Sequence, residues 1–142
     1  MAVALLDTNV LFAMASARDE HHDRAREIVR GIDHGALPNA VLTDYVLAEL
    51  LNLCREKLGP DTANRVLDRL LEGANFEIVH SPKMDFNAAQ PAFRRYSGLS
   101  FVDATIVAYL NREDIEYLYS FDDDFDVIDG ISRLETADDS FK

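Results

Sequence analysis

The chain has 142 residues, the length of one ordinary domain, and its 48% of hydrophobic residues is enough to fill a core. Fourteen basic against 26 acidic residues give a net charge of −12, which argues against non-specific nucleic-acid binding through a basic surface. This balance does not exclude enzymes whose carboxylates hold metal ions, because such side chains add to the acidic excess. No apolar run approaches membrane-spanning length and no basic segment precedes the first one, so we expect a single domain (residues 1–142), cytoplasmic and without a membrane segment.

The first predicted element ends in a carboxylate. Val3 to Leu6 form a short, wholly apolar run, which predicts a buried strand. Asp7, Thr8 and Asn9 interrupt the run, and apolar residues at helical spacing follow them. In parallel α/β sheets, ligands bind at the carboxyl ends of strands, so Asp7 is a candidate site residue. The alternative is that Asp7 or Asn9 simply caps the helix that follows.

A charged stretch and a leucine-rich stretch come next. Residues 18–33 carry apolar side chains at helical spacing and predict an amphipathic surface helix, while residues 40–43 are a strand candidate. Residues 44–58 predict a helix with a broad apolar face, and Glu49 lies at the margin of that face. A glutamate in this position either extends its charged end into solvent or lines a pocket.

The middle of the chain continues the alternation of helices and strands. A short break at Gly59 separates the previous helix from an amphipathic helix over residues 60–73, so the two predict an antiparallel hairpin. Residues 76–80 alternate apolar and polar side chains and predict a strand. Residues 82–96 predict a helix whose second half Pro91 either begins or kinks.

The most apolar helix of the chain carries one acid. From Phe101 to Leu110 apolar residues occupy every side, which predicts a deeply buried helix with Asp103 as the exception. Ser100 and Asp103 fit a capping box, in which a hydroxyl and an acid three residues later close the helix start. Capping accounts for the position of the acid. It does not account for a carboxylate in so apolar a helix, unless charge is needed there.

The last part of the chain supplies a second acid at the end of a strand. Residues 117–121 predict a strand that leads into Asp122, and residues 133–136 are a further strand candidate. The alternation along the chain predicts an α/β fold with a central, mostly parallel sheet of four or five strands and helices on both faces. Since the carboxyl ends of the strands lie along one edge, Asp7 and Asp122 should meet there.

Two further acids should join them, because Glu49 and Asp103 belong to helices that begin at the same edge. Four gathered carboxylates repel one another unless a cation compensates their charge. Oxygen ligands without His or Cys suit Mg²⁺ or Mn²⁺ rather than zinc. One or two such ions can activate water and stabilise the leaving oxygen of a phosphodiester, so no Ser, Cys or His nucleophile is required.

Four segments also resemble a known family. LLDTNVL at the start, TDYVLAELLN in the middle, LSFVDATIVA later and SFDDDF near the end are together similar to PIN-domain ribonucleases. They are most similar to the VapC toxins of prokaryotic type II toxin–antitoxin pairs. The segments fall in the family's order and the likeness covers nearly the whole chain. The resemblance implies a PIN-like, three-layer α/β/α sandwich.

The resemblance also implies an activity and the residues that carry it. It implies an endoribonuclease that hydrolyses RNA phosphodiester bonds with Mg²⁺ or Mn²⁺. The catalytic, metal-binding acids of the family match Asp7, Glu49, Asp103 and Asp122. Asp124 is the alternative fourth ligand, because several aspartates crowd the same turn. Thr8 and Ser120 match positions where the family often keeps a small polar residue beside the acids.

The partners implied by the resemblance are RNA and proteins. The family is commonly homodimeric, and toxins of this type are silenced by a small antitoxin protein whose tail reaches into the site. The predicted hairpin over residues 44–73 is similar to the arm with which the family grips its partner.

Two other functions fit parts of the same pattern. A haloacid-dehalogenase-type phosphatase also opens with an aspartate after a strand, but its chemistry needs a second aspartate two residues later, where this chain has Asn9. A non-catalytic PIN-like domain would bind RNA or a protein without cutting. Such a module has no reason to bear the repulsion of four acids.

Overall fold

The computed structural model describes residues 3–138. Its strands are β1 (Val3–Leu6), β2 (Asn39–Thr43), β3 (Phe76–Val79), β4 (Tyr117–Tyr119) and β5 (Ser132–Leu134). Its helices are α1 (Thr8–Ala15), α2 (His22–Asp33), α3 (Asp44–Leu58), α4 (Pro60–Glu72), α5 (Lys83–Arg95), α6 (Phe101–Glu113) and the short 3-10 helix η1 (Asp123–Val127). Within this described part of the chain, no helix combines the length and apolar character needed to cross a membrane.

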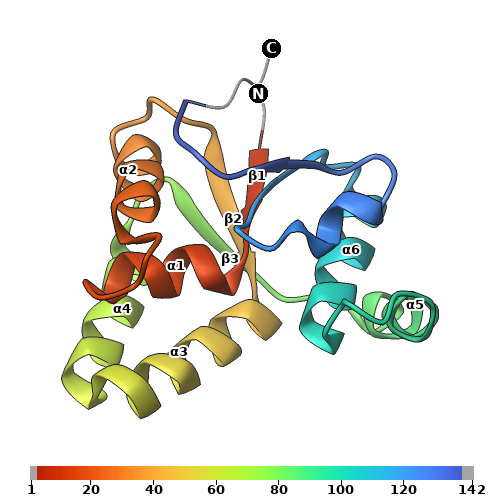
Figure 1. The fold of residues 1–142 in the computed structure, drawn as a ribbon, viewed down its shortest axis with the longest axis horizontal. Coiled ribbons are helices and arrows are strands. Elements are labelled where there is room, and N and C mark those ends of the chain that lie inside the picture. Colours follow the sequence, from red (N-terminus) through yellow and green to blue (C-terminus); the bar gives the residue numbers. More distant parts are fainter. Residues whose placement is uncertain (1–2, 139–142) are drawn as a thin grey trace.

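The five strands form one fully parallel sheet. Their order is β3-β2-β1-β4-β5, so β1 lies at the centre and every neighbouring pair runs in the same direction. In Figure 1, helices α1, α2 and α4 lie to the left of β1, α3 runs below the strands, and α5 and α6 lie to the right. The predicted α/β/α sandwich around a central parallel sheet is therefore confirmed.

Burial of the sheet explains why its strands are apolar. Leu5 and Leu6 of β1, Leu42 of β2 and Leu118 of β4 are inaccessible to solvent. Parallel sheets covered by helices on both faces have such near-continuous apolar strands, because neither side of the strand reaches water. The apolar runs at residues 3–6 and 40–43 therefore mark β1 and β2, whereas β4 ends two residues before the predicted 117–121 and β5 begins and ends earlier than the predicted 133–136.

One helix starts later than predicted. α2 begins at His22 rather than at residue 18, because residues 16–21 form a turn. The Asp19 carboxylate accepts a hydrogen bond from the backbone N–H of His21 (2.8 Å), and the Asp19 carbonyl accepts one from the backbone N–H of His22 (3.0 Å). Aspartate favours such local bonds over a helical position. The turn directs Asp19 toward the carboxyl edge of the sheet.

Successive strands are added first on one side of β1 and then on the other. From β1 the chain builds outward through β2 and β3, then crosses back to place β4 on the other side of β1. The junction of β1 and β4 is therefore the topological switch point, where open α/β sheets bind their ligands. Asp7 follows β1 directly, and its backbone N–H donates a hydrogen bond to the Tyr119 carbonyl of β4 (3.0 Å).

Candidate active site

A cavity of about 250 Å³, here called the acidic pocket, lies at this switch point. The four acids that the sequence singled out all line it: Asp7, Glu49, Asp103 and Asp122. The other residues that line it are Thr8, Asn9, Phe12, Asp19 and Leu53. Segments far apart in the sequence thus bring their carboxylates to one hollow of the surface.

Asp7 is both a helix cap and a pocket residue. It is the N-cap of α1, and its Oδ1 accepts a hydrogen bond from the backbone N–H of Thr8 (2.8 Å). Its Oδ2 accepts one from the Ser120 hydroxyl (2.8 Å) and a longer one from the Asn9 side-chain amide (3.3 Å). The residue is only 4% exposed. Capping and a place in the pocket are therefore compatible, and the hydrogen bonds fix the orientation of the carboxylate.

Burial changes the protonation equilibrium of Asp7. Loss of solvation, with repulsion from the carboxylates of Asp103 and Glu49, raises the pKa of Asp7 from 3.8 to about 7. The hydrogen bonds from Ser120 and Thr8 favour the ionised form but do not outweigh burial and repulsion. A cation in the pocket would favour the ionised carboxylate, because it replaces lost solvation and compensates the repulsion.

Asp103 lies at the start of α6 in the predicted capping box. The Ser100 hydroxyl accepts a hydrogen bond from the backbone N–H of Asp103 (3.1 Å), and the Asp103 Oδ2 accepts one from the backbone N–H of Ser100 (3.0 Å). Burial raises the pKa of Asp103, and repulsion from Asp122 and Glu49 adds to the effect. The capping box thus anchors one carboxylate oxygen at the rim of the pocket.

Glu49 and Asp122 complete the set from two further elements. Glu49 of α3 lines the pocket and is also exposed to solvent. The two alternatives that the sequence left open for it, a pocket position and a solvent-exposed one, therefore both apply. The backbone N–H of Asp122 donates to the Ser120 hydroxyl (3.0 Å), which itself donates to Asp7. Ser120 therefore couples the acid after β1 to the acid after β4.

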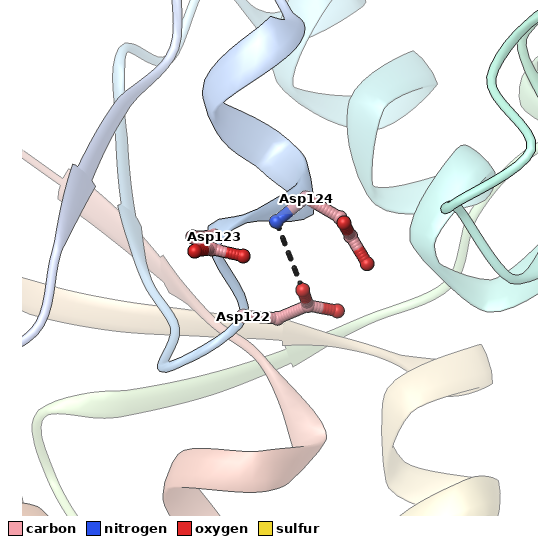
Figure 2. A group of neighbouring side chains, drawn as sticks. All are labelled: Asp122, Asp123 and Asp124. Atoms are coloured by element: carbon pink, nitrogen blue, oxygen red, sulfur yellow. Dashed lines mark hydrogen bonds between the residues drawn. The ribbon is translucent and has the colours of Figure 1, made fainter.

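Asp124, the alternative fourth ligand, does not line the acidic pocket. Its backbone N–H donates to Oδ1 of Asp122 (2.9 Å), as Figure 2 shows, and its carboxylate lies against Gly98. Within residues 3–138, the one group of three or more acids with ligand oxygens within 4.8 Å of one another is Asp122, Asp123 and Asp124. The four pocket acids are thus spread around the cavity walls rather than packed together.

Sequence reasoning missed two features of the pocket. Asp19 adds a fifth acid, and the turn that brings it there leaves no periodic signal in the sequence. Asn9 is not the cap, which is Asp7; it lies within α1, where its amide nitrogen donates to Asp7 and Ser120 (3.3 Å each) and its oxygen accepts the backbone N–H of Phe121 (3.1 Å). Asn9 thereby fastens the end of β1 to the segment after β4.

The residues present fit a hard divalent cation. None of the described residues that line the pocket is Lys, Arg or His, so the protein supplies no positive charge there against the carboxylates. Thr8 also lines the pocket, and its hydroxyl has no hydrogen-bond partner among the described atoms, although the residue is 94% buried. Such orphaned groups are rare and suit a bound ligand. Oxygen ligands around a cavity of this size suit Mg²⁺ or Mn²⁺, which keep several waters.

A parallel α/β sheet with carboxylates gathered at its switch point defines the class, an α/β domain with a candidate divalent-metal site. The chain belongs to the PIN domain family, whose model matches residues 4–131. The family to which the four sequence segments pointed is thus confirmed.

Individual relatives agree with this assignment. A VapC ribonuclease of Mycobacterium bovis is 28% identical over 131 residues, which are 92% of this chain and 98% of that protein. VapC20 of Mycobacterium tuberculosis, a sarcin–ricin loop cleaving toxin, superposes with a TM-score of 0.76 and 25% identity over 87% of this chain and 92% of its own. VapBC2 from Rickettsia felis, solved on a DNA fragment from its promoter, has a TM-score of 0.68 at 17% identity and covers 93% and 97%.

Proposed function

We propose that the chain is a single PIN-like nuclease domain, residues 1–142, that hydrolyses RNA phosphodiester bonds with the help of Mg²⁺ or Mn²⁺. The observation that carries the proposal is the acidic pocket, to which four separate segments each bring a predicted acid. Gathering carboxylates without a cation costs free energy, so the arrangement suits a function that uses one. The names of two relatives, VapC ribonuclease and sarcin–ricin loop cleaving toxin, support RNA as the substrate.

In this proposal the acids of the pocket hold the metal. The proposed ligands are Asp7, Glu49, Asp103 and Asp122. Asp124 ranks behind Asp122, since its carboxylate lies against Gly98 outside the pocket. When bound, Mg²⁺ or Mn²⁺ supplies positive charge that makes water a better nucleophile and stabilises the negative charge of phosphodiester hydrolysis.

The remaining residues orient these acids and leave water as the attacking group. Ser120 and Thr8 hold the two oxygens of Asp7 with hydrogen bonds of 2.8 Å each. The Ser100 capping box holds Asp103 at the helix start. No Ser, Cys or His occurs among the described residues that line the pocket, so none of these side chains is placed to attack the phosphorus.

We also propose that the protein acts as the toxin of a toxin–antitoxin pair and forms a homodimer. A small antitoxin protein would silence it by reaching into the acidic pocket, with the hairpin of α3 and α4 as the arm that grips it. The support comes from relatives: structures of similar fold include a toxin–antitoxin complex from Klebsiella pneumoniae and the VapBC2 complex from Rickettsia felis.

The phosphatase alternative is disfavoured at Asn9. That residue stands where a phosphatase of the haloacid-dehalogenase type needs its acid, and its amide is engaged on both sides by Asp7, Ser120 and Phe121. A side chain held in this way fixes the pocket wall and cannot transfer a proton to a leaving group.

Metal binding and cleavage, measured together, test the proposal. Purified protein should bind Mg²⁺ or Mn²⁺ by calorimetry and cleave at least one RNA of a transfer and ribosomal RNA panel, and EDTA should stop cleavage. Asp103→Asn should abolish cleavage while keeping the helix cap, whereas the control Asp123→Asn, outside the pocket, should keep it. Equal cleavage by Asp103→Asn and the wild type would contradict the proposal, and failure to bind metal or cut RNA would favour a non-catalytic binding domain.

A further inference from the structure

A second cavity, here called the side pocket, is formed by the segment between α5 and α6 and by η1. Its volume is about 230 Å³, and it is lined by residues 95–99 together with Asp124 and Val127. Leu99 is buried, whereas Val127 is 60% exposed and the Asp124 carboxylate is open to solvent. An apolar wall beside a carboxylate favours a flat ligand that carries hydrogen-bond donors.

The walls of the side pocket continue into the acidic pocket. Asp124 lines one and Asp122 the other, and a hydrogen bond of 2.9 Å joins them (Figure 2). On the opposite wall, Leu99 directly precedes Ser100, which bonds Asp103. Cα atoms two residues apart lie within about 7 Å of each other. A chain molecule bound across the acidic pocket can therefore place its next unit in the side pocket.

Arg95 lines the side pocket and is exposed. None of the ion pairs among the described residues 3–138 includes it. Its guanidinium carbon lies 5.1 Å from the centroid of the Tyr96 ring. Arg112 and Arg133, in contrast, are tied to carboxylates of their own fold. Stacking on Tyr96 restricts Arg95 while leaving its N–H donors free for an anion such as a phosphate.

We propose that the side pocket holds the base of the nucleotide next to the cleaved bond of a single-stranded RNA; this rests on the proposed function. Leu99 and Val127 contact the face of the base, and the Asp124 carboxylate accepts hydrogen bonds from its edge. Arg95 binds a neighbouring phosphate. Single-stranded RNA is read in this way, by packing on the faces of bases and hydrogen bonds to their edges.

The chemistry of Asp124 predicts which base is preferred. An ionised carboxylate offers only acceptors, so the base must present donors. Guanine presents two adjacent donors, N1–H and the N2 amino group, which match two carboxylate oxygens. Adenine and cytosine present one amino group beside an acceptor nitrogen. Uracil places its single N–H between two carbonyl oxygens that repel the carboxylate. The order of preference should therefore be guanine first and uracil last.

Mapping of cleavage sites on random RNA tests the base preference. The probe is a pool of single-stranded RNAs of about twelve nucleotides, with the cut ends read by sequencing. The wild type should cut beside guanine about 10-fold more often than beside uracil. Asp124→Asn, which replaces one acceptor by a donor, should remove most of this difference. Asp123→Asn is the matched control, since Asp123 is exposed, lines neither pocket and should keep the preference.

A binding experiment tests the role of Arg95. Anisotropy of labelled RNA should be measured on protein carrying Asp7→Asn, so that the RNA stays intact. Adding Arg95→Ala should weaken binding several-fold for all sequences alike and lower the slope of log affinity against log salt by about one. Arg94→Ala removes the same charge from the neighbouring exposed position, lines neither pocket, and should leave both quantities unchanged.

The two arms separate this proposal from the proposed function. The same anisotropy assay on guanine-rich and uracil-rich RNA covers a wild type that does not cut. Tighter binding of the guanine-rich RNA that Asp124→Asn removes, with no cleavage by the wild type, would support the side pocket and overturn RNA hydrolysis. Cleavage without base preference, or an equal loss of preference in Asp123→Asn and Asp124→Asn, would overturn the side pocket and leave RNA hydrolysis standing. Equal thermal unfolding of the wild type and the two Asp→Asn variants verifies that all are folded.

Discussion

Two buried aspartates of this fold are stabilised in opposite ways. Asp7 is 4% exposed and Asp85 is 1% exposed, so both have lost nearly all contact with water. Asp85 of α5 receives two hydrogen bonds from the guanidinium of Arg112 of α6, at 2.7 and 3.1 Å. Asp7 receives only neutral donors and lies near the carboxylates of Asp103 and Glu49.

The difference separates a carboxylate whose charge the fold compensates from one whose charge it leaves uncompensated. Asp85 carries its counter-charge within the fold, and its carboxylate in turn raises the pKa of Arg112. Asp7 has no cationic side chain beside it in the acidic pocket, so a cation from solution would favour its ionised form. Burial alone does not tell the two apart; the partner that the fold provides does.

The largest expected effect is loss of activity in Asp7→Asn. Asparagine keeps the size and the helix cap but removes the charge with which Asp7 is proposed to hold the metal, so RNA cleavage should fall by roughly 1,000-fold. Cleavage should be measured under single-turnover conditions with Mg²⁺. The control is Asp129→Asn, an exposed aspartate that does not line the pocket. Cleavage at the wild-type rate by Asp7→Asn would mean that RNA cleavage does not need the charge of Asp7.

The next effect is loss of stability in Arg112→Met. The change leaves Asp85 buried without its partner, which should lower the free energy of unfolding by roughly 3–4 kcal/mol. The lower end applies if solvent screens the pair, because the Arg112 side chain is 29% exposed. Urea unfolding measures the change, and cleavage per folded molecule should be unaffected.

Two further variants sharpen this second test. Arg94→Met removes an exposed arginine from α5 that lies outside the pair, and it should change stability by no more than about 0.5 kcal/mol. Adding Asp85→Asn to Arg112→Met should recover part of the loss, because the buried charge is gone. Equal destabilisation by Arg94→Met and Arg112→Met would mean that the ion pair does not stabilise the fold.

The third effect is a pH dependence of the metal-free protein. Folding raises the pKa of Asp7 from 3.8 to about 7, so the folded state binds its proton more tightly than the unfolded state. This contribution to stability is full below about pH 4 and is lost as the pH rises through about 7. In EDTA, unfolding free energy of the wild type should fall by roughly 2–3 kcal/mol from about pH 5 to about pH 8, relative to Asp7→Asn. Parallel pH profiles of the two proteins would contradict the burial argument.

The smallest effect is expected for Ser120→Ala. The Ser120 hydroxyl donates to Asp7 and accepts the backbone N–H of Asp122, so its loss should loosen two acids without removing a charge. Partners of this kind typically change metal affinity by about 10-fold. Calorimetric titration with Mg²⁺ measures the change. Ser132→Ala, which removes a hydroxyl bonded to Glu116 away from the pocket, should leave the affinity unchanged.

The strands and the four acids could be predicted because their signals are local or follow from topology. The run from Val3 to Leu6 marks a buried strand, and the strand–helix alternation predicts the parallel sheet. Once the sheet is parallel, acids after its strands share an edge, so Asp7 and Asp122 meet. The four acids line the predicted pocket, while their roles as metal ligands stay a prediction.

The rest depends on contacts that sequence patterns do not encode. Asp19 reaches the acidic pocket through a turn within a stretch whose spacing looks helical. Asp85 and Arg112 are 27 residues apart on two helices, and nothing in either helix announces the other partner. The side pocket needs the segment around Gly98 to lie beside η1, which only the packing of the folded chain decides.

The central position of β1 also determines when the sheet can be completed during translation. β1 leaves the ribosome first, yet one of its two neighbours, β4, is made more than a hundred residues later. Domains fold as units during synthesis, so a growing chain holds Asp7, Glu49 and Asp103 on an unfinished sheet until Asp122 has emerged. The acidic pocket therefore gains the last of its four predicted acids only after β4 has been made.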